Sequence, residues 1–415
     1  MTKSIDKSTD TLSSDQSNKS SCLPIEKPSS KELWKYFLHL GLTGYGGPLA
    51  IVAQMQKDFA AKKWSTVDEF NTTIPLIKSM PGPVALQTAA FWGGQMLGLK
   101  GALIGAIGLT LPAMIMMIAL AAIYPTLQSH SQILHSFKGL QIVALVLVVK
   151  SLFDLARPIY KEKHFLIFSI IALAMTYLQL PEPLIFLLTG IIAYLVWSLK
   201  NKPKNLAVGV LPSSMTLAST FVTNTQSMGI AINEGTGELA NLGLAFWFSF
   251  GTVLITAGTL VFGTGLAILP FLQTQFVEQL HWMKASEFLD ALAFAQLTPG
   301  PVLIIVTFLG YRFAGLLGAL FATFLVFLPG FFHMTTWFPI VFKKLRLQKW
   351  ITPVSQAIMG AVIASLAVSS FKLTQSFNRQ ELSLGFILLF VVLKKKIPSY
   401  YIFLIGAVTG WLFLS

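Results

Sequence analysis

Two Pro-Gly-Pro tripeptides, each inside a long apolar stretch, are the feature of this sequence that most clearly points to chemistry. They occupy residues 81–83 and 299–301. Proline lacks a backbone N–H and clashes with the preceding turn, so we expect a helix to break at each tripeptide and a fresh helix to begin at its last proline. The start of a helix presents N–H groups and a partial positive charge, which favour an anion. Within a membrane, such backbone is tolerated only inside protein or beside a water-filled cavity.

Two polar residues sharpen this prediction, because Lys78 and Gln296 each stand three residues before a Pro-Gly-Pro. A lysine at the centre of a bilayer costs about 2.5–3.5 kcal/mol on insertion scales, so it usually faces a cavity or a partner. A lysine and an amide at the two breaks could hold a small oxyanion by charge and hydrogen bonds. The alternative is that the tripeptides are structural kinks and that Lys78 lies shallow and snorkels to the interface.

Other polar residues give weaker signals. Arg312, in "FLGYRFAG", could attract an anion or be an ordinary interfacial charge, and Gln87 follows the first break. Asp290 could carry a proton, although one acidic residue near a segment start says little, and Lys150 and Asp154 have the spacing of a helical ion pair. We expect no catalytic residue, metal or cofactor. The predicted substrate-binding residues are Lys78, Pro81, Gly82, Pro83, Gln87, Gln296, Pro299, Gly300, Pro301 and Arg312.

The composition indicates the setting of these residues. Of 415 residues, 54% are hydrophobic and 11% are charged, whereas soluble proteins carry about 25% charged residues. Long apolar runs recur from about residue 33 to the C-terminus, and a span takes roughly 20 residues. The runs do not alternate with period two, so the sequence predicts an all-α polytopic membrane protein rather than a β-barrel. The net charge of +13 is typical of cytoplasmic loops and indicates no nucleic acid. A single cysteine excludes an intrachain disulfide.

The chain contains an internal repeat. Chance apolar similarity would match Leu with Leu, but it would not match Trp, Glu-Phe and Pro-Gly-Pro at one spacing. At an offset of 218 the matches are Trp64/Trp282, Glu69-Phe70/Glu287-Phe288 and 81–83/299–301. At an offset of 217 they are Tyr45-Gly46/Phe262-Gly263, Leu49-Ala50-Ile51/Leu266-Ala267-Ile268, Gly98/Gly315, Gly101-Ala102-Leu103/Gly318-Ala319-Leu320 and Pro112/Pro329.

We predict twelve segments, six in each half. They are 33–55, 72–93, 98–124, 137–155, 165–180 and 183–199, then 242–270, 287–310, 314–340, 352–372, 382–393 and 398–413. The predicted organisation is a disordered cytoplasmic tail (1–30), a first repeat (31–204), a linker or extra crossing (205–240) and a second repeat (241–415).

The basic residues predict that the halves have opposite orientations, because cytoplasmic loops are enriched in Lys and Arg. The stretch 126–136 has no Lys or Arg, whereas its counterpart in the second half has four. An inverted repeat needs an odd crossing between the halves, which 205–232 could supply, for about 13 crossings. One loop disagrees: 56–69 contains three lysines, yet this topology places it outside. Three further basic clusters agree with opposite orientations when they are placed in the cytoplasm: Arg157/Lys161/Lys163, Lys200/Lys202/Lys204 and Lys394/Lys395/Lys396.

The ordered motifs "FLHLGLTGYGGPLA", "PGPVALQ" and "GLKGALIGAIGLTLP", with "SEFLDALAFAQLTPGPV" and "GYRFAGLLGALFATFLVFLPG" in the second half, resemble the chromate ion transporter family in its long two-domain form. The resemblance covers nearly the whole chain after residue 31. It implies a carrier of the bacterial inner membrane that expels chromate and confers resistance to it. The family usually has an aromatic-Arg motif after the first Pro-Gly-Pro, where this sequence reads "FWGGQMLG", and tends to have a neutral residue where Lys78 stands.

Alternative functions remain at this stage. Sulfate or another tetrahedral oxyanion shares the shape and charge of chromate. A membrane-embedded enzyme is disfavoured because the sequence has no H-E-x-x-H motif and no Gly-rich nucleotide loop, and a receptor would not need symmetric breaks. The lack of a nucleotide motif favours movement driven by a gradient. The oligomeric state is open, and a homodimer is compatible with the sequence.

Overall fold

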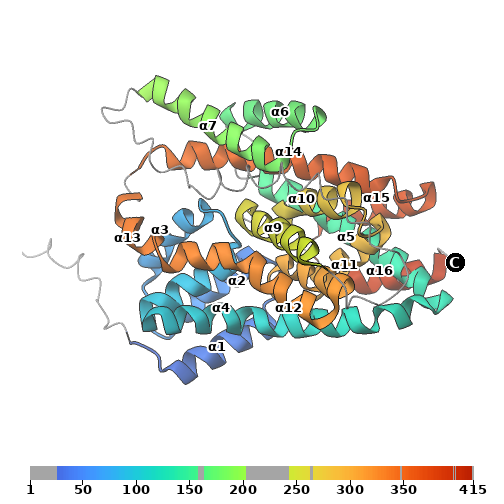
Figure 1. Cartoon of the computed structure of the whole chain (residues 1–415), viewed down its shortest axis with the longest axis horizontal. Helices are drawn as coiled ribbons and strands as arrows, with labels where there is room; N and C mark the ends of the chain where they lie inside the picture. Colours follow the sequence, from blue (N-terminus) through green and yellow to red (C-terminus); the bar gives the residue numbers. More distant parts are fainter. Residues whose placement is uncertain are drawn as a thin grey trace, which may run out of the picture.

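The computed structural model describes residues 26–157, 163–201, 243–261, 265–345, 348–395, 397 and 399–413, and within them helices are joined by turns and short connections (Figure 1). The predicted tail (1–30) lies mostly, and the predicted linker (205–240) entirely, outside the described residues. The helices of the first half are α1 (Ser30–Thr43), α2 (Pro48–Ala61), α3 (Val67–Lys78), α4 (Val84–Gln128), α5 (Ser131–Ala156), α6 (Lys163–Tyr177) and α7 (Glu182–Asn201). Those of the second half are α9 (Leu244–Leu260), η3 (Gly265–Ile268), α10 (Leu269–Gln273), η4 (Thr274–Gln279), α11 (Ala285–Leu297), η5 (Val302–Ile304), α12 (Ile305–Thr335), α13 (Phe338–Leu345), α14 (Ile351–Thr374), α15 (Arg379–Lys394) and α16 (Ser399–Phe413).

The helices have the lengths and surfaces of a multi-pass membrane protein. Within the described residues, five helical stretches are long and apolar enough to cross a bilayer: Val84–Gln128, Leu134–Ala156, Glu182–Asn201, Val302–Val341 and Ile351–Thr374. Large apolar side chains stay exposed on their outer faces, such as Leu317 (71%) and Phe386 (71%). A soluble protein rarely exposes so much contiguous apolar surface, whereas lipid tails accept it.

The first two helices form a hairpin rather than the single predicted segment 33–55. The Tyr36 hydroxyl donates to the Asp58 carboxylate at 3.1 Å, and the rings of Phe37 and Phe59 lie 6.3 Å apart. Residues 22 apart would be about 33 Å apart on one straight helix, so α1 and α2 run side by side in opposite directions. The prediction of one continuous segment is wrong because the chain turns at 44–47, where two consecutive glycines have φ of 100° and 84°.

A second hairpin has the first Pro-Gly-Pro at its tip. A capping box of Thr66 and Glu69 starts α3, and Phe70 in its first turn stacks on Trp92 of α4 with 5.3 Å between centroids. The start of α3 therefore lies beside residue 92, and the chain folds back at 81–83. The predicted break is present, but it is the tip of a hairpin and not an interruption midway along one crossing.

Helix α4 contains a further reversal, which ends this hairpin and begins a long apolar helix. Leu97 (φ −131°, ψ 23°) and Gly98 (φ 62°, ψ −152°) are non-helical. Across this turn Gly93 packs directly on the backbone of Gly101, which a straight helix would not allow. The α3 hairpin therefore spans residues 67–97, and the apolar helix runs from 99 to Gln128.

The second half repeats this design. Helix α9 pairs with the α10–η4 stretch, since Phe250 lies 6.0 Å from Phe276. Helix α11 pairs with the start of α12, and the second Pro-Gly-Pro lies at the tip. The turn that ends the second hairpin has the same shape as the first, because Ala314 (φ −144°, ψ 29°) and Gly315 (φ 59°, ψ −151°) match Leu97 and Gly98.

Two irregular helices explain why the repeat offset changes along the chain. The offset rises from 217 to 218 between residues 268 and 282, and η4 in this stretch is a π-helix, which accommodates one extra residue. The offset returns to 217 after the second Pro-Gly-Pro, where η5 is a 3₁₀-helix opposite a regular α-helical turn. A 3₁₀-helix rises further per residue, so it covers the same length with fewer residues.

The two halves are interlocked by their last helices. Helix α5 of the first half packs on α15 and α16 of the second, and α14 of the second half packs on α6 and α7 of the first. Glycines permit the closest of these approaches, with Gly139 of α5 directly against Gly406 of α16. The tips of the α3 and α11 hairpins lie against the long helices of the opposite halves, Gly82 on Gly330 of α12 and Gly300 on Ala113 of α4.

Candidate functional site

The tips of the hairpins meet crosswise at the centre of the protein. The Gly82 N–H donates to the Val261 carbonyl at 2.6 Å, and the Gly300 N–H donates to the Gly44 carbonyl at 3.0 Å. Gly44 and Val261 differ by 217 positions, so they are equivalent in the repeat. Each Pro-Gly-Pro thus binds the end of the first helix of the opposite half, and these glycine N–H groups are occupied.

The long helices of the opposite halves support the same tips. A Cβ on Gly82 (φ 129°) would lie 2.9 Å from the Gly330 Cα of α12, and a Cβ on Gly300 (φ 105°) would lie 3.0 Å from the Ala113 Cβ of α4. Gly330 and Ala113 also differ by 217 positions. Only glycine adopts this backbone without strain, so both tripeptides need their central glycine for conformation and for space.

A cavity of about 450 Å³ opens at the second Pro-Gly-Pro. Gln296, Thr298, Gly300 and Val302 form one wall. The opposite walls are formed by the turn of the first hairpin (44–49), by α5, and by Ile397, Tyr400 and Ile402 around the start of α16. Val302 starts a helix, and the first N–H groups of a helix have no intrahelical acceptor. The cavity therefore reaches the positive end of a helix at the centre of the protein.

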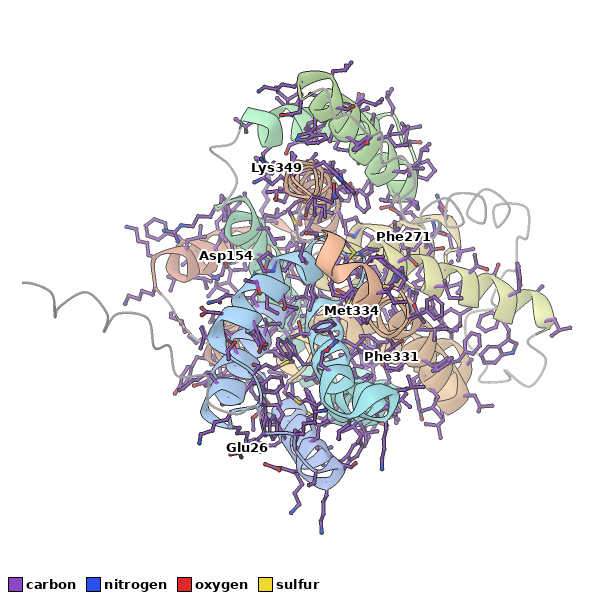
Figure 2. All side chains as sticks on the ribbon, turned by 90° about the vertical axis from the view of Figure 1, so that its left-hand side faces the viewer. Glu26, Asp154, Phe271, Phe331, Met334 and Lys349 are labelled. Atoms are coloured by element: carbon purple, nitrogen blue, oxygen red, sulfur yellow. The ribbon has the colours of Figure 1, made fainter. Side chains whose placement is uncertain are left out.

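An ion pair lies on the α5 wall of this cavity. The ammonium of Lys150 donates to the carboxylate of Asp154 one turn later, and Ser151 lies beside them. The Lys150 side chain is 33% exposed and that of Asp154 is 57% exposed. Figure 2 looks at the end of the molecule that carries α3 and α13, and it shows Asp154 beside the blue N-terminal helices. The cavity thus holds a cation whose charge is partly balanced by a neighbouring anion.

The structure brings some of the predicted residues to this cavity and leaves others apart. Gln296 and Gly300 line it, and the Gln296 amide donates to the Ala144 carbonyl of α5 at 3.2 Å. Pro299 and Pro301 flank Gly300 at the same tip. Gln87, in contrast, is fully buried at the first tip, where its Nε2 donates to the Pro81 carbonyl at 2.6 Å.

Three further predicted positions lie away from the cavity. Pro83 packs against Gly330, and Lys78 is the partly exposed last residue of α3. The Arg312 Nε donates to the Glu287 carboxylate at 2.6 Å, and its guanidinium lies 5.5 Å from the ring centroid of Tyr124. Arg312 therefore joins the two arms of the second hairpin at the end opposite its tip.

Sequence reasoning missed the cavity residues on α5 and those of the turn at 44–47, which contains consecutive glycines. The spacing of Lys150 and Asp154 predicted their pairing, and the pairing is confirmed, but nothing in that spacing indicated a cavity. Residues 44–47 are not among the predicted binding residues. It is the fold-back of the two hairpins that brings this turn to the second Pro-Gly-Pro.

The sequence profile of the family described as chromate transporter matches residues 31–195 and 248–411. The chain belongs to the chromate transporter family. The two matched regions correspond to the two halves of the fold, so one unit of this family supplies the two hairpins and the long helices of each half.

Several members of the chromate transporter family are similar along most of their length. A chromate transport protein of Cupriavidus metallidurans is 30% identical over 81% of this chain and 82% of its own. A probable chromate transport protein of Synechococcus elongatus is 28% identical over 93% of this chain and 96% of its own. A chromate transport protein of Pseudomonas aeruginosa is 25% identical over 81% of this chain and 80% of its own. No solved structure matches the chain.

Proposed function

We propose that this protein is a secondary transporter that exports chromate across the bacterial inner membrane and thereby confers resistance to it. The observation that carries the proposal is the cavity at the second Pro-Gly-Pro, which combines a helix start with a lysine. Relatives that are named chromate transport proteins support chromate as the substrate. Sulfate, which has the same shape and charge, is the alternative.

The anion site lies between the start of the η5–α12 helix and Lys150. Oxyanions bind well where helix N–H groups and a cation converge. Gln296 and Thr298 add polar groups on the same wall. Because Lys150 pairs with Asp154, a dianion that binds here must compete with that carboxylate for the ammonium.

We propose that the halves are inverted with respect to each other, and contacts between their ends support this. The second arm of the α3 hairpin lies beside the end of α12, where Phe91 is 5.5 Å from Phe338 at the start of α13. The base of the α11 hairpin lies at the end of α4, where the Arg312 guanidinium is 5.5 Å from the ring centroid of Tyr124. In halves of the same orientation, the two bases would meet each other. In Figure 1 the labels α3 and α13 stand at the left and α11 and α16 further right.

If each hairpin returns to the side of the membrane from which it entered, the three lysines of loop 56–69 no longer disagree with the predicted orientation. With α1–α2 and α3–α4 as re-entrant hairpins, this loop stays on the side of the N-terminus, and its three lysines become cytoplasmic. Each half then crosses the membrane four times, the first by the long part of α4 and by α5, α6 and α7, and the second by the long part of α12 and by α14, α15 and α16. With one predicted crossing in 205–232, we propose nine crossings instead of about 13.

In this orientation, the cavity opens to the cytoplasm. Lys150 lies two turns before the end of α5, which is capped by Arg157, and the next helix, α6, begins with Lys163. The mouth of the cavity is therefore on the basic side of the membrane, where an exporter collects its substrate. Net positive charge around the mouth also raises the local concentration of an anion.

In an inverted repeat, each half can adopt the conformation of the other, and this exchange would open the protein to the opposite side of the membrane. An outward-open cavity would then form at the first Pro-Gly-Pro, and Lys78 would take the place that Gln296 has in the inward-open cavity, because the two positions are equivalent. Lys150, by contrast, has Ala367 at its equivalent position. The dianion would thus meet one lysine on each side.

Inside-out membrane vesicles test the proposed function. We expect vesicles with the protein to accumulate labelled chromate faster than vesicles without it, and unlabelled sulfate to compete only weakly. A chromate flux equal to that of protein-free vesicles would refute chromate transport, and stronger labelling with sulfate than with chromate would favour the alternative.

A further inference from the structure

A buried carboxylate lies on the second hairpin, apart from the cavity. Asp290 on α11 is 4% exposed. Its Oδ2 accepts a hydrogen bond from the Tyr124 hydroxyl of α4 at 2.6 Å, and its Oδ1 accepts one from the Gln141 amide of α5 at 2.8 Å. Both donors belong to the first half, so these two bonds tie the second hairpin to the long helices of the opposite half.

The partners of Asp290 are themselves held in place. The Gln128 amide donates to the Tyr124 oxygen at 2.7 Å, which directs the Tyr124 proton toward the carboxylate. The Gln141 amide also lies 3.3 Å from the Ser286 carbonyl. Both carboxylate oxygens therefore accept hydrogen bonds from neutral donors, an arrangement that fits the ionised form.

The charged groups around Asp290 are otherwise paired. Arg312 of α12 is bound to Glu287, one turn before Asp290 on α11. On α5, Lys138 is bound to Glu381 of α15 at 3.0 Å, and His135 lies a further turn away. The titratable groups of α16 are Tyr400 and Tyr401 at its start, and η5 has none. Among the described residues, no cation pairs with Asp290, so its charge depends on neutral donors alone.

The repeat shows that this network belongs to one half only. The positions equivalent to Asp290, Tyr124 and Gln141 are occupied by Thr72, Val341 and Ile358. Structural features of the hairpins, such as the Pro-Gly-Pro tips and the turns at Gly98 and Gly315, are in contrast repeated. An ionisable group that breaks the symmetry of an otherwise repeated design within a membrane points to function rather than to architecture.

We propose that Asp290 is the proton-binding residue that couples transport to the proton gradient, and that its two hydrogen bonds latch the gate on the side opposite the cavity. This inference rests on the proposed function. Asp290 stands two turns before Gln296 on α11, about 9 Å along the helix, so it lies between the cavity and the base of the hairpin. In the proposed orientation, that base faces the outside.

Protonation would release the latch. A proton from the outer water adds to one carboxylate oxygen, so one O–H bond forms and the charge is neutralised. That oxygen becomes a donor. If it is Oδ1, it faces the Gln141 Nε2, which can only donate, so the bond to α5 is lost; if it is Oδ2, the Tyr124 hydroxyl must turn its own proton away in order to accept. In either case the present pair of bonds is broken, α11 is loosened from α4 or α5, and the outer side can open while the inner cavity closes. Return of the proton to the cytoplasm restores the latch.

Purified protein in proteoliposomes, with labelled chromate as the probe, allows two assays. The first measures exchange of chromate across the membrane without a pH gradient, and the second measures net flux driven by an imposed pH gradient, with a pH-sensitive dye inside. We expect Asp290→Asn, which keeps the shape but cannot ionise, to retain exchange within about two-fold and to lose the response to the gradient. Asp68→Asn is the matched control, because Asp68 is an exposed carboxylate on the equivalent helix α3.

Tyr124→Phe supplies a second readout that a purely structural role would not produce. It removes a hydrogen bond to the ionised carboxylate, and a bond of that kind contributes enough to shift the pH profile of net flux upward by about one to two units. The inference is overturned if Asp290→Asn still responds to the gradient, if it loses exchange together with that response, or if the Tyr124→Phe profile is unchanged. A wild-type protein that exchanges chromate but ignores the gradient also overturns it, whereas a wild type that moves no chromate refutes the proposed function itself.

Discussion

Replacing Lys150 by glutamine should weaken chromate binding strongly. Its ammonium is the cation on the wall of the central cavity, and its side chain is 33% exposed. Two unit charges 4 Å apart attract by about 4 kcal/mol at an effective dielectric constant of 20. Solvent at a one-third exposed group reduces this value, so we take the range for a charged hydrogen bond, about 1.5–3 kcal/mol. The half-saturation concentration should then rise roughly 10- to 150-fold.

The loss of Lys150 also leaves Asp154 unpaired at the site, and its negative charge would repel the substrate. The double variant Lys150→Gln/Asp154→Asn separates the two effects, because it removes the repulsion and should recover part of the affinity. Lys150→Arg keeps the charge and should stay nearer the wild type. Lys100→Gln is the control, since Lys100 is exposed at the turn of α4 and lies outside the cavity.

The assay is the initial rate of labelled chromate uptake into inside-out vesicles over a wide concentration range, with protein levels matched by immunoblot. The reasoning is refuted if Lys150→Gln has the half-saturation concentration of the wild type. It is also refuted if Lys100→Gln is impaired equally, because the effect would then reflect net charge rather than this site.

Three further predictions follow from the same geometry. Asp154→Asn alone should lower the half-saturation concentration several-fold in the uptake assay, because it frees Lys150 for the anion; an increase would contradict the proposed competition. Gly82→Ala and Gly300→Ala should each destabilise the protein by about 1–3 kcal/mol through strain at positive φ, which thermal unfolding in detergent would detect as a lower midpoint, and unchanged midpoints would show that the tips adapt. Lys78→Gln should raise the half-saturation concentration roughly 10- to 150-fold, with Lys78→Arg milder and Lys78→Glu worst; identical values for all three would make Lys78 a snorkelling residue.

Much of the architecture was predictable because it depends on local chemistry. Proline and glycine at 81–83 and 299–301 set the breaks, and both central glycines have the positive φ that such a turn needs. The repeat was visible because residues with specific roles recur, such as Glu69 and Glu287 in the first turns of α3 and α11. The changes in repeat offset were visible as well, and they correspond to the π-helix and the 3₁₀-helix.

The hairpins were not predictable from hydropathy, because apolarity measures contact with lipid or protein and not the direction of the chain. A broken helix that continues and one that folds back have the same composition. The direction is decided by contacts between distant residues, such as Phe70 with Trp92 and Arg312 with Glu287. Arg312 was therefore placed at the anion site, although its partner 25 residues earlier holds it at the hairpin base.

The cavity was only partly predictable for the same reason. Gln296 and Gly300 line it because they share the tip of one hairpin. Lys150 reaches it from α5, a different element, and no spacing along the chain relates the two. The sequence indicated only weakly that Asp290 could carry a proton, because the two groups that donate to its carboxylate lie 166 and 149 residues away in sequence.

The central claim is that the anion passes through the cytoplasmic cavity at the second Pro-Gly-Pro. Ser151→Cys in a Cys22→Ser background tests it most directly, because Ser151 lines that cavity. A bulky, membrane-impermeant thiol reagent is applied to one face of the vesicles and removed before labelled chromate is added. We predict that treatment of the cytoplasmic face abolishes the flux and that treatment of the outer face leaves it intact. A flux that survives complete labelling of the introduced thiol, or one that is blocked only from the outer face, would contradict the account.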